Sequence, residues 1–422
     1  MNNIDLETRL ARAARVLDEH TEQPSTVPGY LAPAPRPSRR RPLLASVGVF
    51  ACALAFIGAV IYDRTDNSTT VSQTSVDEGW TALPEAPISP RFQHLAVSTG
   101  TGLFVWGGYG SDFESDGAYL DSTRNTWRKL PNAPLDSDRG DAIGVWTGRE
   151  VVVVNGVGPV RAAAFDPVAF TWRALPDPPL ANAANAMNRA FFVDGAVIVI
   201  GVASEGDGNA PSQIARLDLA TSQWTTGETP VQQFASFFAA TIAGDEIIVV
   251  AQRPNMKERC GSIVLAYQPT SDTWRELPAG PVADRLSPVV AWTGSELFVG
   301  GGRMCGDTRE PSPSADLLDT VTGVWREAPA APIGFAASGR YDEVWTGHSV
   351  ATIDRAGTPV LFNPVTNTWH VGAPSRGEGK FDDTPFVWVD GAILIWSGGA
   401  IDGPMCCIPV GGGVSYTPPP GF

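Results

Sequence analysis

Three arginines occupy equivalent positions in a repeating sequence and carry the clearest binding chemistry of the chain. Arg91, Arg139 and Arg285 each stand nine residues before a glycine that recurs with the repeat. A guanidinium group binds a carboxylate through two parallel hydrogen bonds. If the fold places the three side chains around one opening, they predict a local anion-binding site in an otherwise acidic region.

Aspartates near these positions suggest a different role for the arginines. Asp382 stands where the last repeat would have its arginine, and Asp138, Asp141 and Asp383 lie close by in the sequence. These carboxylates could neutralise the guanidinium groups within the protein. We therefore keep two interpretations of the three arginines: ligand binding, in which Asp382 takes part, or a structural role.

Four of the five cysteines fall in long segments between predicted strands. Cys260 and Cys305 occupy equivalent segments of neighbouring repeats, and Cys406 and Cys407 are adjacent. An even number of cysteines in an oxidising compartment favours disulfides over free thiols. One bridge within each pair, or cross-pairing between the two pairs, would satisfy all four. Cys52 lies in an apolar segment and is interpreted as a small apolar residue.

Histidines and acidic loops show no pattern typical of metal chemistry. His94, His348 and His370 fall on different parts of the repeat, so they do not converge as a copper or zinc site requires. The segment DFESDG at 112–117 begins like a calcium loop, but its twelfth position is Thr123 where glutamate is needed. We predict no catalytic residue, no metal and no other cofactor.

The repeat that positions these residues has a period of about 45–50 residues. It is marked by seven tryptophans, Trp80, Trp127, Trp172, Trp224, Trp274, Trp325 and Trp369. In phase with them, a glycine precedes a short apolar run such as LFVWGG, VVVVNG or ILIWSGG. Such runs are too short for globular helices and predict buried strands. The glycine suits a tight hairpin turn, which needs a positive φ.

Each repeat therefore predicts four strands, named a to d in chain order, with the glycine between a and b and the tryptophan in d. One sheet of four short strands cannot bury both of its faces, whereas seven such sheets packed radially can. The expected fold is an all-β, seven-bladed β-propeller over residues 78–422.

The unit RFQH…GLFVWGG…NTWRKLP, residues 91–131, resembles a kelch repeat. That pattern combines a basic residue and a histidine on the inner strand, a double glycine after strand b, and an aromatic residue followed by tryptophan. The chain is thus similar to the kelch family, of the galactose-oxidase-like central-domain superfamily. The likeness covers about residues 78–422 and implies a propeller, but no particular ligand.

The order of the strands predicts how the ring closes. The last repeat supplies strands a, b and c, and the sequence reaches Phe422 before the tryptophan of strand d. The segment EGWTALPEAP at 78–87 is a strand d with no a, b or c before it. We predict that Trp80 completes blade seven beside residues 414–417, so that no sheet edge stays open.

Antiparallel strands also determine which connections share a side of the ring. The a–b and c–d turns lie on one side, here called the turn face, and the b–c and d–a connections lie on the other, the loop face. The b–c segments are long and irregular, as in GGYGSDFESDGA and GGRMCGDTREPSPS. Long loops on a rigid scaffold commonly carry binding, so the loop face is the expected site.

An apolar segment at residues 43–62 predicts a membrane anchor. It holds 20 uncharged residues, enough for a helix to cross the hydrocarbon layer, and four arginines lie between 36 and 41. The positive flank predicts a cytoplasmic N-terminus and an extracytoplasmic propeller. A cleaved signal peptide is the alternative, but the preceding segment is long and a small-residue cleavage site is lacking.

The remaining segments complete the predicted organisation. Residues 1–42 form a cytoplasmic tail with a short amphipathic helix at 4–19 and a Pro-rich linker, and residues 63–77 form a polar linker. The helix is either marginal in a flexible tail or a docking element for a cytoplasmic partner. The net charge of −15 leaves about −17 for residues 63–422, which disfavours nucleic acid as a partner.

Together these features predict a single-pass membrane protein with an extracytoplasmic recognition module. Its expected ligand is a protein or an envelope glycan bound at the loop face. One alternative is a carbohydrate-active enzyme, a hydrolase, epimerase or oxidase, with its site at the mouth of the central channel. Another is a signalling relay in which the helix at 4–19 reports ligand binding to the cytoplasm.

Overall fold

The computed structural model describes residues 79–135, 142–155, 160–180, 189–201, 213–230, 238–252, 262–281, 285–305, 310–336, 344–354, 356–375, 384–402 and 405–422. The chain divides into two compact units, Met1–Gln73 and Thr74–Phe422, and all described residues belong to the second. Over these residues the structure is all-β and contains no α-helix.

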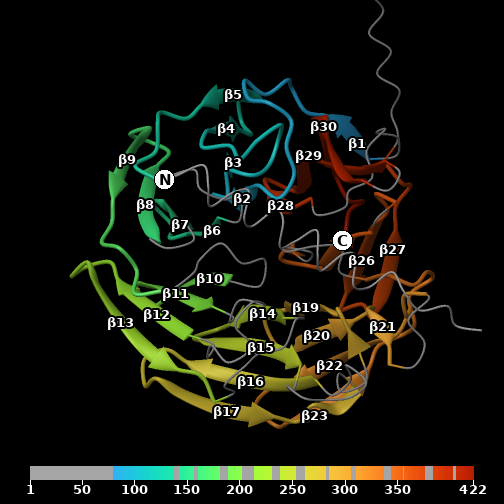
Figure 1. Cartoon of the computed structure of the whole chain (residues 1–422). Helices are drawn as coiled ribbons and strands as arrows, with labels where there is room; N and C mark the ends of the chain where they lie inside the picture. The colour runs from blue at the N-terminus through green and yellow to red at the C-terminus, as the bar shows by residue number, and fades with distance from the viewer. Residues whose placement is uncertain are drawn as a thin grey trace, which may run out of the picture. The chain divides into compact units, whose positions relative to one another are not determined.

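Seven four-stranded antiparallel sheets and one two-stranded ladder account for the described strands. Figure 1 shows the seven sheets arranged around a common axis as the blades of a propeller. This confirms the predicted fold class, a seven-bladed β-propeller.

The blades take their strands in chain order, with strand a innermost (Figure 1). Blade one comprises β2 (Leu95–Ser98), β3 (Gly102–Trp106), β4 (Gly117–Asp121) and β5 (Thr126–Lys129), and blade two comprises β6 (Ile143–Trp146), β7 (Val151–Asn155), β8 (Arg161–Asp166) and β9 (Thr171–Ala174). Blade three comprises β10 (Arg189–Val193), β11 (Ala196–Gly201), β12 (Gln213–Asp218) and β13 (Gln223–Glu228). Blade four comprises β14 (Phe238–Ala243), β15 (Glu246–Gln252), β16 (Ser262–Gln268) and β17 (Thr273–Leu277).

Blade seven differs from the others because its outer strand comes from the start of the described chain. Blade five comprises β19 (Val289–Trp292), β20 (Leu297–Gly300), β22 (Ala315–Asp319) and β23 (Val324–Glu327), and blade six comprises β24 (Val344–Trp345), β25 (Val350–Ile353), β26 (Pro359–Asn363) and β27 (Thr368–Val371). Blade seven comprises β28 (Phe386–Val389), β29 (Ala392–Asp402), β30 (Met405–Tyr416) and β1 (Trp80–Ala82). The separate ladder pairs β18 (Arg285–Leu286) with β21 (Arg303–Met304).

The apolar runs of the sequence lie in the core because strand b of each blade is covered by neighbouring blades on both sides. All five residues of β7 are buried, whereas three of the four residues of β9, the strand d of the same blade, are exposed. Seven apolar clusters lie between consecutive blades, including one between blades seven and one. Burial of such surface is the main favourable contribution to folding.

Closure of the ring follows the predicted pairing. β1 pairs antiparallel with β30, with Trp80 opposite Tyr416 and Ala82 opposite Val414. The amide of Thr417 donates to the carbonyl of Gly79 at 2.9 Å, which extends the ladder by one residue. The rings of Trp80 and Tyr416 lie 5.0 Å apart.

The repeated tryptophans connect each blade to the one before it. Trp127 in β5 donates its indole N–H to the carbonyl of Pro84, which follows β1, at 2.9 Å. Trp80 donates in the same way to the carbonyl of Ala373, which follows β27, at 2.8 Å. The same bond, at 2.7–3.0 Å, is made by Trp172, Trp224, Trp325 and Trp369 to Pro131, Pro176, Pro278 and Pro329.

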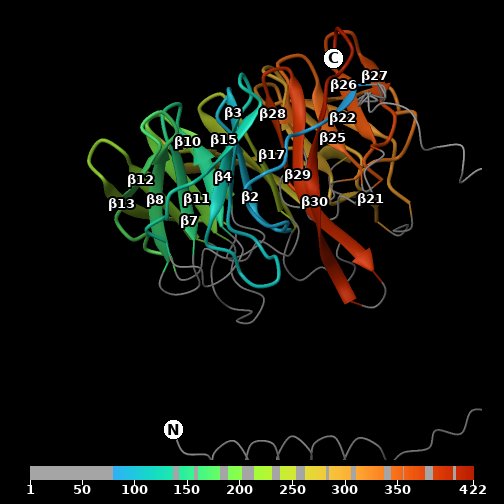
Figure 2. The same cartoon turned by 90° about the horizontal axis from the view of Figure 1, so that it is seen from above.

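The two faces of the ring are built differently. Figure 2 shows short turns along one face, while the β29–β30 hairpin extends beyond the other. The a–b turns use glycine in the left-handed region, for example Gly148 at φ 86°, a conformation that other residues adopt at a cost.

In the part of the chain that the structure describes, no helix is long and apolar enough to cross a membrane. The predicted anchor at 43–62, the helix at 4–19 and the linker at 63–77 lie outside the described residues. These three segments therefore stay predictions.

We expect that Trp80→Ala will lower the free energy of unfolding by about 3–5 kcal/mol, because it removes a buried aromatic side chain from the closing strand. Trp80→Phe keeps a ring but loses the bond to Ala373, and should cost about 1 kcal/mol. Urea unfolding of the purified chain measures both. Val168→Ala, at a side chain that is 93% exposed, is the control. Equal stability of Trp80→Ala and this control would contradict closure by β1.

Candidate recognition site on the loop face

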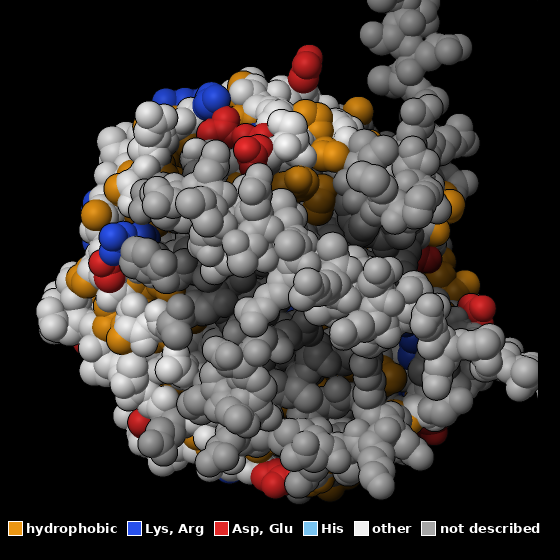
Figure 3. Space-filling view, viewed as in Figure 1, with side chains coloured by type: hydrophobic (Ala, Val, Ile, Leu, Met, Phe, Trp, Pro, Cys, Tyr) orange, Lys and Arg blue, Asp and Glu red, His pale blue; other side chains and the backbone are white. Residues whose placement is uncertain are grey.

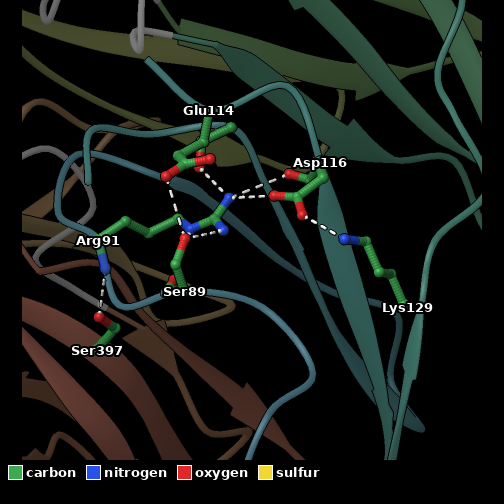
Figure 4. A network of polar contacts seen from close by, with 7 residues as sticks. Ser89, Arg91, Glu114, Asp116, Lys129 and Ser397 are labelled. Atoms are coloured by element: carbon green, nitrogen blue, oxygen red, sulfur yellow. Dashed lines mark hydrogen bonds and ion pairs between the residues drawn. The ribbon is translucent and has the colours of Figure 1, made fainter. Parts of the chain in front are cut away.

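Arg91, the first of the three predicted arginines, is buried at the junction of blades seven and one (Figure 4). Its guanidinium group donates from Nε to the carbonyl of Ser89 at 2.9 Å and from Nη2 to the hydroxyl of Ser89 at 3.0 Å. Nη1 lies 3.3 Å from the carbonyl of Gly107 and forms an ion pair of 2.8 Å with Asp116. The guanidinium group thus holds both ends of the b–c loop of blade one.

A bulge in β29 ties Arg91 to the last blade. The ladder between β29 and β30 shifts register between Trp396 and Gly398, and Ser397 takes a φ of 56°. The hydroxyl of Ser397 accepts from the backbone N–H of Arg91 at 2.8 Å and donates to the carbonyl of Val410 at 2.8 Å. β-Bulges re-aim a side chain in this way.

Asp116 is shared between two cations. Besides Arg91, it pairs with Lys129 of β5 at 2.8 Å. Partial burial would raise the pKa of the Asp116 carboxyl, but the hydrogen bonds and charges of Lys129 and Arg91 outweigh this and hold the pKa below its usual value. The carboxylate is therefore ionised at neutral pH.

Arg285 repeats this arrangement in blade five. It donates to the carbonyls of Gly301 and Ser314 at 2.9 and 3.1 Å, and to the hydroxyl of Ser314 at 3.0 Å. Its ion pair is with Asp316 of β22 at 2.8 Å. Both guanidinium groups thus join the end of strand b to the start of strand c within one blade.

The two arginines use these donors inside the protein, which agrees with the structural role that the sequence left open. Arg91 is 0% and Arg285 is 3% exposed. Arg139 and Asp382 lie outside the described residues, so the structure does not show whether the four predicted residues meet. The sequence did not identify the partners Asp116 and Asp316. We looked for carboxylates close to the arginines before strand a, whereas the partners lie at the end of the b–c loop.

The loop held by Arg91 presents aromatic side chains. Phe92 and Tyr109 are joined by reciprocal backbone hydrogen bonds of 2.9 and 3.0 Å, and their rings lie 5.3 Å apart. Phe113 packs edge-on against Tyr109 at 5.2 Å and is 43% exposed. Figure 3 looks onto this face and shows acidic and hydrophobic side chains side by side near blade one.

Acidic residues precede and follow Phe113 in the chain. The carboxylate of Asp112 accepts from the backbone N–H of Phe113 at 2.8 Å, and Glu114 accepts from the hydroxyl of Ser89 at 3.0 Å (Figure 4). The segment at 112–117, which begins like a calcium loop, is thus fixed by its own hydrogen bonds. No cluster of three His, Cys, Asp or Glu side chains able to hold a metal ion occurs within the described ranges.

His94 is buried beneath this loop. It is 3% exposed, its ring stacks edge-on at 5.3 Å against Trp396, and both ring nitrogens lack a hydrogen-bond partner among the described residues. Burial, with a smaller contribution from the charge of Arg91, lowers the pKa of His94 to about 3. His94 is therefore neutral and acts as a packing residue.

Of the predicted disulfide residues, the structure shows one side chain. Cys305, which ends the described segment after β21, is disulfide-bonded. Cys260 and the side chains of Cys406 and Cys407 lie outside what the structure describes, so the pairing among the four stays a prediction.

Comparison with known proteins leaves the family open. No protein-family model matches the sequence, and no curated protein matches it.

His94 makes the stability of the fold depend on pH in a defined direction. Its pKa is about 3 in the folded chain and near 6.5 when unfolded, so the unfolded state binds more protons between these values. Stability is full above about pH 6.5 and is lost as the pH falls. We expect His94 to remove about 2 kcal/mol of unfolding free energy between pH 8 and pH 5.

The measurement compares urea unfolding of the parent chain and of His94→Leu at both pH values. Between pH 8 and pH 5 the variant should lose about 2 kcal/mol less unfolding free energy than the parent chain, whatever its absolute stability. If the two chains lose the same free energy between pH 8 and pH 5, His94 is not buried in its neutral form.

Proposed function

We propose that the chain is a membrane-anchored, extracytoplasmic recognition module that binds a protein or an envelope glycan at the loop face of its kelch-like propeller. The observation that supports this most strongly is the b–c loop of blade one. It combines a rigid base with an exposed aromatic ring and carboxylates, features that favour selective binding over a purely structural turn.

Rigidity of this loop comes from several connections. Arg91 holds both of its ends, Ser397 fixes the backbone of Arg91 to blade seven, and the Phe92–Tyr109–Phe113 contacts fix its tip. A preorganised loop loses little conformational entropy on binding, so more of the contact energy appears as affinity. An exposed phenyl ring then supplies a contact face for a sugar ring or an apolar side chain.

The cellular arrangement of the proposal comes from the sequence. The apolar segment at 43–62 would anchor the chain, with residues 1–42 in the cytoplasm and the propeller outside. The helix at 4–19 would then be available to a cytoplasmic partner. The acidic charge of residues 63–422 makes nucleic acid an unsuitable ligand.

The carbohydrate-active alternative receives less support. It would use Arg91 and Arg285 at the channel mouth, but both guanidinium groups donate to backbone carbonyls and aspartates of their own blades. A group that binds substrate needs free donors directed to it. We therefore favour binding without turnover.

The test uses the full-length chain in detergent on an array of purified envelope polysaccharides, with a second arm that places a photo-crosslinking amino acid at position 113 in cells. We expect either a bound polysaccharide or a discrete cross-linked protein. Phe113→Ala should weaken array binding about tenfold or more, the usual effect of losing a central aromatic contact, while Phe113→Tyr should retain it.

Val321→Ala, in the c–d turn of blade five on the opposite face, is the matched control and should bind as the parent chain does. The proposal is wrong if neither arm gives a signal, or if Phe113→Ala binds as well as the control.

A further inference from the structure

An arginine and a glutamate form the same pair in three blades. The arginine follows the tryptophan of strand d, and the glutamate stands at the start of strand b, next to the a–b turn. Each guanidinium group donates two hydrogen bonds, of 2.7–3.0 Å, to one carboxylate. The pairs are Arg173–Glu150, Arg275–Glu246 and Arg326–Glu296.

Blade one keeps the arginine but lacks its partner. Arg128 lies opposite Tyr119 in the ladder, as Arg173 lies opposite Ala164. The position of the glutamate is taken by Gly102, which pairs with Asp121. A Cβ atom on Gly102 would lie 2.2 Å from the hydroxyl oxygen of Tyr119, so the phenol occupies the space that the carboxylate fills elsewhere.

In the three remaining blades, neither the arginine nor the glutamate is present. The residue after the tryptophan is Thr225, His370 or Thr81 in blades three, six and seven, and the glutamate position holds Ala196, Ser349 or Ala392. Among the described strands, only blade one therefore has the arginine without the glutamate. An arginine that has no internal partner, where the equivalent arginines are paired, points to a partner from outside the chain.

The surroundings of Arg128 agree with this. The carbon of its guanidinium group lies 3.6 Å from the ring centroid of Phe170, in the c–d turn of blade two. No hydrogen bond or ion pair joins the side chain of Arg128 to another residue that the structure describes. Stacking on the face of a ring leaves the N–H groups at the edge of the guanidinium plane free to donate.

Arg128 lines a groove between blades one and two on the turn face. The groove has a volume of about 860 Å³ and is also lined by Arg124, Arg149, Trp146 and Tyr119. The same position between blades five and six has only about 320 Å³, and its lining residue Glu296 is paired with Arg326. The larger groove falls within the usual size of small-molecule sites.

The charge of this groove is positive in an acidic protein. Two aspartates line it beside the three arginines, and both are engaged in their own turns. Asp121 accepts from Thr123 and pairs with Arg124, and Asp166 accepts from two backbone N–H groups. Like Arg128, Arg149 has no ion pair in the described part of the chain. Two guanidinium groups are thus available to an anion.

We propose that this groove binds an acidic sugar, a hydroxyl-bearing ring that carries a carboxylate or a phosphate. Arg128 pairs with the anionic group through its free edge, and Arg149 adds a second donor from the a–b turn of blade two. Trp146 offers a face for the ring, and the exposed hydroxyls of Thr101 and Thr126 suit its hydroxyl groups.

Several features favour a sugar over an acidic peptide. The groove is lined mainly by turns of two blades, and β5, the edge strand whose Thr126 and Arg128 line it, has only four residues for a peptide to pair with. Its lining is rich in threonine, which donates and accepts hydrogen bonds as sugar hydroxyls require. The site lies on the turn face, so it does not depend on the loop-face recognition proposed above.

The experiment is calorimetric titration of the full-length chain with galacturonic acid oligomers, glucose 6-phosphate, matched neutral sugars, inorganic phosphate and a hexaglutamate peptide. We expect one of the acidic sugars to bind, and the neutral sugars not to. Arg128→Gln should weaken this binding about tenfold or more, since it removes a charged hydrogen-bonding partner. Raised salt should weaken it as well.

Arg173→Gln is the matched control, because it changes the equivalent arginine in a blade where glutamate already engages it. The double variant Gly102→Glu with Tyr119→Ala reproduces the arrangement of blade two around Arg128 and should also abolish binding while the arginine remains. Thermal unfolding confirms that each variant is folded.

Preference for the carboxylated or the phosphorylated sugar identifies which anion the site takes. The proposal is overturned if no acidic sugar binds, if neutral sugars bind equally, if only the peptide binds, or if Arg128→Gln binds like Arg173→Gln.

Discussion

The hydrogen bond that six of the seven strand-d tryptophans donate to the carbonyl following the previous strand d is the constraint on which the propeller depends. Neighbouring blades are otherwise joined mainly by apolar packing, which has no direction. The indole N–H fixes where one blade meets the next, and Trp80 and Trp127 continue the series across the junction of the two chain ends. Closure through β1 therefore uses the same indole hydrogen bond as the junctions formed by Trp172, Trp224, Trp325 and Trp369.

Once the ring is fixed, the blades can diverge without loss of the fold. Buried arginines stiffen the b–c loops of blades one and five from within, and the loops then differ in sequence and length. On the turn face the outer arginine is paired in three blades, absent in three and unpartnered in blade one. Equivalent positions can be compared among the blades. A blade that departs from the others then shows which side chain has no internal partner.

Much of this could be predicted from the sequence, because the repeat is periodic and its signals are local. The prediction that Trp80 lies beside residues 414–417 is confirmed by the ladder, in which Trp80 is opposite Tyr416 as Trp369 is opposite Phe362 in blade six. The partners of Arg91 and Arg285 could not be predicted in this way. They depend on how each b–c loop returns to strand c, and irregular loops follow no period. The absence of a glutamate at Gly102 can be read from the sequence by comparing the repeats. The environment of Arg128 could be seen only in the structure, because Tyr119 and Phe170 come from other strands and turns.

Circular closure is tested most directly by disulfide trapping of the terminal ladder. Thr81 lies opposite Ser415, and directly opposed residues of antiparallel strands have Cα atoms within the range that a disulfide spans. The double variant Thr81→Cys with Ser415→Cys should oxidise to an intramolecular bridge, identified by mass spectrometry of the proteolytic fragments, and should unfold at a higher temperature than its reduced form. Failure to form that bridge in the folded chain, with the two cysteines reacting separately with a thiol reagent, would contradict the closed ring.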